Sequence, residues 1–156
     1  MTVETNKVLV QRVFNEGFNR GDLSVVDELV ASTGCDHQHP DVENFTQHLK
    51  AVIAAMREAM PDLHFEISQI IGEGEWVALH SVMSGTNSGP MAAPLIPENG
   101  PPSIPATGRS IRVPHMHMIK MEGGKGVELF HLMDTMSMLG QLGLLPTPAG
   151  QAAKPE

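Results

Sequence analysis

The 156-residue sequence contains no tyrosine, one tryptophan and one cysteine, and aromatic residues account for only 4% of it. Tyrosine is the side chain that offers a phenol, so a mechanism that needs a phenolic hydrogen-bond donor is excluded for this chain. The single cysteine, Cys35, excludes a framework of internal disulfides and fits a reducing compartment. We therefore expect a cytoplasmic protein that depends on an apolar core rather than on disulfides.

Basic residues and long apolar runs are also scarce. Ten lysines and arginines stand against 18 acidic residues, which gives a net charge of −8 and leaves no basic patch for nucleic acid or an anionic membrane. No apolar stretch approaches the roughly 18 residues that span a bilayer. The polar N-terminus, MTVETNK, lacks the apolar run of a signal peptide. Neither nucleic acid nor a membrane is therefore expected as a partner.

The hydrophobic pattern changes from a helical to a strand period about halfway along the chain. Helical spacing of apolar residues predicts three helices, over residues 3–18, 23–31 and 45–60. Alternation predicts strands over residues 63–68 and 76–84 and a hairpin over 111–134, followed by a short helix over 135–142. Helices followed by antiparallel strands predict an α+β fold in which the helices cover one face of a curved sheet. We expect one domain over residues 1–146 and a disordered tail over 147–156.

Two features of the composition bear on a possible pocket. The 11 methionines offer pliable side chains that suit an adaptable apolar pocket, although they also suit a methionine-rich core. Six prolines between Gly89 and Pro105 prevent a helix or an inner strand in this segment. A connection of this length is typical of a lid or rim loop. A surface loop without function fits the segment equally well.

The hairpin from Ile111 to Asp134 contains His115, His117 and His131, which are its only residues that titrate near neutral pH. Alternation places His115 and His117 on one face of the first strand. A three-residue turn with Gly124 in the left-handed region would pair Met121 with Lys125 and place His131 opposite His115, so that three imidazoles share a face. A two-residue turn would instead move His131 to the other face.

Three interpretations of the hairpin histidines remain open from the residues alone. His117 and His131 suit an acid/base pair, because imidazole titrates near 6.5 and a pair can hold one proton donor and one acceptor at neutral pH. The three histidines, with His80 or His37 as a fourth ligand, suit a catalytic zinc site. Histidines on a strand face can also be structural, satisfied by backbone carbonyls, water or a subunit interface.

Several short motifs occur in order along the chain. They are FN at 14–15 with NRGD at 19–22, MPDL at 60–63, GTNSG at 85–89, PATGR at 105–109 and QLG at 141–143. Together they resemble the SnoaL-like polyketide cyclases, also called the ester cyclase family, from about Val10 to Pro146. The resemblance implies a cone-shaped α+β barrel, shared with ketosteroid isomerase, scytalone dehydratase and limonene epoxide hydrolase. In this fold a curved antiparallel sheet wraps a long helix and leaves an apolar pocket at its open end.

The resemblance also implies a reaction and a set of site residues. Characterised cyclases close the last ring of a polyketide by intramolecular aldol condensation, without metal or cofactor. Their pocket histidine corresponds to His117, whereas their acid/base aspartate is replaced here by His131, and the second acidic position is kept as Asp134. We therefore expect His117, His131 and Asp134 to be catalytic. The other residues expected to line the pocket are Phe14, Met56, Met60, His80, His115 and Phe130.

The function expected from residues and resemblance together is metal-free acid/base catalysis on an apolar carbonyl compound. Aldol cyclisation, isomerisation and dehydration all fit a pair of imidazoles that face each other across a pocket. No cofactor and no metal is expected, and the resemblance implies a homodimer that packs through the outer face of the sheet. The alternatives are a non-catalytic protein that binds an apolar ligand in the same pocket and the histidine-coordinated metal site.

Overall fold

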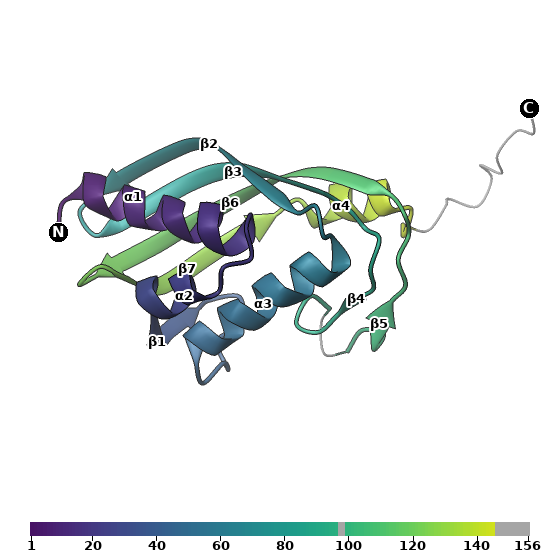
Figure 1. Cartoon of the computed structure of the whole chain (residues 1–156), viewed down its shortest axis with the longest axis horizontal. Coiled ribbons are helices and arrows are strands. Elements are labelled where there is room, and N and C mark those ends of the chain that lie inside the picture. Colours follow the sequence, from purple (N-terminus) through teal and green to yellow (C-terminus); the bar gives the residue numbers. More distant parts are fainter. Residues whose placement is uncertain (97–98, 146–156) are drawn as a thin grey trace, which may run out of the picture.

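The computed structural model describes residues 1–96 and 99–145, and Figure 1 shows how its helices and strands are arranged. The tail predicted for residues 147–156 lies outside the described residues. The helices are α1 (Val3–Arg12), the π-helix η1 (Val13–Phe18), α2 (Ser24–Leu29), α3 (Phe45–Ala59) and α4 (Thr135–Leu142). The strands are β1 (Val30–Asp36), β2 (His64–Glu73), β3 (Trp76–Thr86), β4 (Met91–Ala92), β5 (Ser103–Ile104), β6 (Ser110–Glu122) and β7 (Lys125–Met133).

Five strands form one curved sheet in the order β1-β7-β6-β3-β2, and β4 and β5 form a separate two-stranded ribbon. The neighbouring strands of the large sheet are antiparallel except for β1, which runs parallel to β7. Helices α1 and α3 lie on the same side of this sheet (Figure 1). The predicted α+β fold with a curved, mainly antiparallel sheet is confirmed, and the sheet is not closed into a full barrel.

The core lies between the inner face of the sheet and the helices. Strand β3 alternates between buried and half-buried residues along its whole length, so that Val77, Leu79 and Met83 face inward. Ile53 and Met56 of α3 are buried against this layer. Within the described part of the chain, no helix is long and apolar enough to cross a membrane.

The sequence pattern predicted one continuous helix over residues 3–18, but the geometry of this helix changes before its end. Its last six residues form a π-helix, in which the Asn19 amide donates to the Phe14 carbonyl at 2.9 Å. Within it, the rings of Phe14 and Phe18 are stacked with 5.3 Å between centroids, and both side chains are buried. Such π-helical segments are rare and often occur at functional sites.

The turn of the β6–β7 hairpin differs from the prediction, but the face of its histidines does not. The turn has two residues, Gly123 and Gly124, both at positive φ (56° and 82°), where glycine is favoured. By itself this turn would put His131 on the outer face. A β-bulge follows, because Met121 pairs with Gly126 whereas Lys120 pairs with Glu128, which leaves one extra residue in β7.

The bulge restores the alternation, so that His117 lies directly opposite His131, while His115 lies opposite Met133. The expected pairing of His115 with His131 is therefore wrong, because the partner of His131 lies two residues further along β6. The expected grouping of three imidazoles on one face is confirmed, through a two-residue turn and a bulge rather than through a three-residue turn.

The side chain of Asn19 ties the end of η1 to β2 and offers a test of this packing. Its Nδ2 donates to the Phe65 carbonyl at 3.0 Å and its Oδ1 accepts from the Phe65 amide at 2.7 Å. Asn19→Ala should lower the free energy of unfolding by about 1–3 kcal/mol, because a half-buried strand amide and carbonyl lose their partners. Urea denaturation measures this. Asn15→Ala, at an exposed position of the same π-helix, is the control, and an equal loss in both variants would contradict the assignment.

Candidate active site

A cavity of about 950 Å³ opens between the inner face of the sheet and the helices. Its walls come mainly from apolar side chains of η1, α3, β6 and β7, and the segment around β4 contributes to one side. Phe14, Met56, Met60 and His115 line it, as the sequence had suggested. His117 and His131 also line it.

His115 and His117 lie side by side on β6 and face this cavity. They are 8% and 7% exposed, and their ring centroids lie 4.0 Å apart. The edge of Phe14 packs against His117 with 4.9 Å between centroids. Within the described part of the chain, neither Nδ1 atom has a hydrogen-bond partner.

Burial keeps both of these imidazoles neutral. It lowers the pKa of His115 to about 3, with a smaller contribution from the positive charge that a protonated His131 would place nearby. Burial also lowers the pKa of His117 well below its usual range, and the neighbouring His115 and His131 add to the effect. Two neutral imidazoles thus line an apolar cavity at neutral pH.

His131 connects this pair to a carboxylate. Its Nε2 lies 3.4 Å from Oδ2 of Asp36, and its Nδ1 lies 3.5 Å from Nε2 of His115. The backbone amide of His131 donates to the Gln38 side chain at 2.8 Å, which joins β7 to the loop after β1. Both ring nitrogens of His131 therefore have a neighbour, one charged and one neutral.

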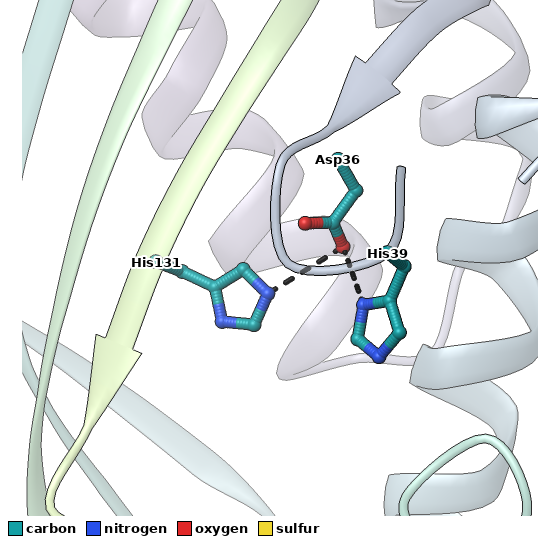
Figure 2. Close-up of side chains that lie close together, drawn as sticks. All are labelled: Asp36, His39 and His131. Carbon is teal, nitrogen blue, oxygen red and sulfur yellow. Dashed lines mark hydrogen bonds and ion pairs between the residues drawn. The ribbon is translucent and has the colours of Figure 1, made fainter. Parts of the chain in front are cut away.

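Asp36 is a candidate functional residue that the sequence analysis did not identify. It ends β1, is 4% exposed and lines the cavity. Its Oδ1 accepts from the Gln38 amide at 2.9 Å. Its Oδ2 lies 3.1 Å from Nδ1 of His39 and 3.3 Å from Nε2 of His48, in addition to His131. Figure 2 shows His39 and His131 approaching this carboxylate from two sides.

The donors around Asp36 hold it in the ionised form. Burial alone would raise the pKa of Asp36, but the hydrogen bonds from His131, the Gln38 amide and His39 outweigh it and hold the pKa well below its usual range. The adjacent His48 has a pKa lowered by its burial and by the nearby His39, against the opposing effect of Asp36. The wall of the cavity thus contains a buried, ionised carboxylate with three imidazoles around it.

Three residues expected at the site lie elsewhere. His80 does not line the cavity, because it occupies the outward-facing register of β3, where its Nδ1 is hydrogen-bonded to the Ser68 hydroxyl. Phe130 lies on the outer face of β7 and stacks on His37 with 3.8 Å between centroids. Asp134 is exposed and caps α4 by accepting from the Ser137 amide at 2.9 Å, and it does not line the cavity.

The interpretation that His37 or His80 supplies a fourth metal ligand to the hairpin histidines is not supported. His37 is paired with Glu128 at 3.0 Å and His80 faces away from the cavity. Among the described residues, the ligand atoms that do converge are those of Asp36, His39 and His131, which all lie within 4.8 Å of one another.

Comparisons with known proteins bear on the family and the fold of this chain. The family model of the SnoaL-like polyketide cyclases matches residues 8–142. The chain therefore belongs to the SnoaL-like polyketide cyclase family. No curated protein sequence matches it significantly.

Solved structures share the fold over nearly the whole chain. TsrD from Streptomyces laurentii is 22% identical, with a TM-score of 0.79 over 93% of this chain and 99% of its own. IdmH from Streptomyces antibioticus, a candidate polyketide cyclase, is 26% identical, with a TM-score of 0.69 over 88% and 98%. AclR from Streptomyces galilaeus, a candidate hydroxylase, is 21% identical, with a TM-score of 0.74 over 94% and 85%.

The burial of His115 leads to a prediction on stability. In the folded chain the pKa is about 3, whereas in the unfolded chain it returns to about 6.5. The unfolded state therefore binds the extra proton first, and stability present above about pH 6.5 falls as the pH drops toward 3. Between pH 7.5 and 5, the wild-type chain should lose about 2 kcal/mol more than a His115→Gln variant.

Urea unfolding at the two pH values measures this difference. His80→Gln makes the same substitution on the outer face of the neighbouring strand and should keep the wild-type dependence on pH. Equal losses in the wild type and in the His115→Gln variant would show that His115 is not held neutral by burial.

Proposed function

We propose that this chain is an enzyme that transfers protons on an apolar carbonyl compound, with His131 as the general base and His117 as the hydrogen-bond donor to the substrate oxygen. The reaction class is aldol cyclisation, isomerisation or dehydration. The observation that carries the proposal is the pair formed by buried Asp36 and His131 at 3.4 Å, next to two imidazoles whose pKa values are lowered. Membership of the SnoaL-like polyketide cyclase family supports a small apolar substrate.

Asp36 prepares His131 for the role of base. A carboxylate that accepts from Nε2–H fixes the tautomer in which Nδ1 carries the lone pair. The same carboxylate stabilises the imidazolium that forms when Nδ1 takes up a proton. In the family the acid/base group at this position is itself an aspartate. Here the carboxylate acts from β1, through the imidazole of His131.

His117 suits the role of donor because it is neutral. Removal of a proton from the carbon next to a carbonyl moves negative charge to the carbonyl oxygen. An N–H group that faces an apolar cavity stabilises this charge more than the same group does in water. A neutral imidazole can act in this way without a positive charge in the cavity.

The proton balance of an aldol closure then needs no further group. His131 Nδ1 takes the proton from the carbon, and the enolate carbon forms a bond to the second carbonyl carbon. The resulting alkoxide takes the proton back from the imidazolium of His131. His115 adjoins the base, since its Nε2 lies 3.5 Å from His131 Nδ1.

Deuterium exchange tests the acid/base chemistry without knowledge of the natural substrate. In D₂O, the wild-type chain should catalyse exchange at the carbon next to the carbonyl of 2-tetralone, a fused bicyclic ketone, as measured by proton NMR. His131→Ala and His117→Ala should each slow the exchange by about 100-fold or more. His64→Ala, at an exposed position on β2, is the matched control.

Circular dichroism should show the three variants folded. Wild-type exchange rates in both His131→Ala and His117→Ala would refute the proposal. Saturable binding of the ketone without exchange would favour the alternative, a binding protein for apolar ligands. The apolar lining of the cavity supports that alternative as well.

We also propose that the chain forms a homodimer through the outer face of its sheet. This face carries Met116, Met118 and Leu132, which are 49%, 41% and 73% exposed. Met116 pairs with Leu132 across β6 and β7, and Met118 pairs with Phe130, so the apolar side chains are contiguous. Contiguous exposed apolar residues of this kind mark interaction surfaces.

Leu132→Glu should convert the dimer to a monomer, because it places a charge in the centre of the apolar contact. Sedimentation equilibrium measures the change. Met136→Glu, at a 65% exposed apolar position on α4, should leave the dimer intact. A monomeric wild-type chain would exclude this assembly.

A further inference from the structure

We propose that Asp36, His39 and His131 form a binding site for a divalent first-row transition-metal ion, with zinc as the probe. The site shares His131 with the proposed acid/base pair but uses a different nitrogen of its ring. Its consequence for catalysis therefore rests on the proposed function, whereas the binding of the ion does not.

The distances between the three ligand atoms fit a metal ion. Oδ2 of Asp36 lies 3.1 Å from Nδ1 of His39 and 3.4 Å from Nε2 of His131. Around a tetrahedral zinc ion with bonds of about 2.0–2.1 Å, neighbouring ligand atoms are roughly 3.3 Å apart. All three ligand atoms also lie within 4.8 Å of one another. The side chains thus need only small adjustments to share one ion. Figure 2 shows how the three side chains lie.

The chemistry of the ligand set points the same way. Two imidazoles and one carboxylate are ligands that zinc and ferrous iron accept in proteins. The three residues line the large cavity, so an ion held by them would have its remaining coordination positions on the cavity side. A net charge of −1 from Asp36 offsets half of the charge of the ion.

Groups around the site hold the ligands in place. The Gln38 amide donates to Oδ1 of Asp36 at 2.9 Å, which leaves Oδ2 for the ion. His48 Nε2 lies 3.3 Å from the same Oδ2 and can donate to the lone pair that the ion does not use. Nδ1 of His131 lies 3.5 Å from Nε2 of His115. A partner for the second ring nitrogen is a regular feature of histidines that bind metal.

The ion would change the tautomer of His131. Without metal, Nε2–H donates to Asp36 and Nδ1 offers the lone pair that removes a proton from the substrate. With metal, Nε2 gives its lone pair to the ion and the proton of the neutral ring moves to Nδ1. His131 then has no lone pair for the substrate. Binding of the ion should therefore inhibit proton transfer.

Calorimetric titration of the metal-stripped full chain with zinc tests the binding. We expect one equivalent to bind. His39→Ala should weaken the affinity for zinc by at least about tenfold. Removal of a residue that only orients a metal ligand already causes a loss of this size. The His39 side chain is 42% exposed, so this variant should fold. Asp36→Asn should weaken binding in the same way, with Asp41→Asn in the exposed loop and His64→Ala as matched controls.

The absorption spectrum of the cobalt-loaded chain and the nitrogen NMR signals of His131 provide a second readout. Cobalt should give the visible bands of a low-coordinate site in the wild-type chain but not in the His39→Ala variant. Zinc should move the imidazole proton of His131 from Nε2 to Nδ1. Absence of saturable binding, or equal affinities in wild type and His39→Ala, would overturn the site.

Inhibition is tested separately by the exchange of 2-tetralone. Zinc at one equivalent should suppress wild-type exchange, and chelation should restore it. Tight binding without inhibition would overturn the tautomer change. A metal-free wild-type chain that does not catalyse exchange would refute the proposed function, while the titrations would still decide whether the ion binds.

Discussion

The arrangement of the site follows from one constraint, the ionised carboxylate of Asp36 in an apolar cavity. A charge removed from water is strongly unfavourable unless hydrogen-bond donors replace the solvent. The Gln38 amide, His39, His48 and His131 surround this carboxylate. They come from the loop after β1, from α3 and from β7. Three parts of the fold therefore contact this one charge.

The same constraint separates the histidines into two groups. His39, His48 and His131 contact the Asp36 carboxylate. His115 and His117 lie deeper among apolar side chains, and burial lowers their pKa values. One wall of the cavity therefore places an imidazole against a buried carboxylate, and the adjacent wall presents two buried imidazoles with lowered pKa values. Side chains of one chemical type thus have different surroundings, an arrangement that acid/base sites use widely.

Much of the fold could be predicted from local patterns. The apolar spacing of α3 was readable, because it depends on residues close in sequence. The parallel pairing of β1 with β7 was not readable, since it joins segments about 90 residues apart. Asp36 was therefore missed, because its contact with His131 depends on that pairing. The Asp36-x-x-His39 spacing was the only local signal. His80 was misplaced because β3 is apolar on both faces, so that alternation could not say which face is inside.

The bulge in β7 has a consequence for how such a site can arise or disappear. One additional residue lies in β7 between the pairs Met121–Gly126 and Lys120–Glu128. It determines which side of the sheet every later residue of the strand faces. Loss of a single codon there would exchange Leu132 and His131 between solvent and cavity without altering either amino acid. In this hairpin the set of side chains that faces the cavity is thus determined by the length of the strand as much as by its composition. Alignments that place a gap freely near the turn would match histidines that face opposite sides of the sheet.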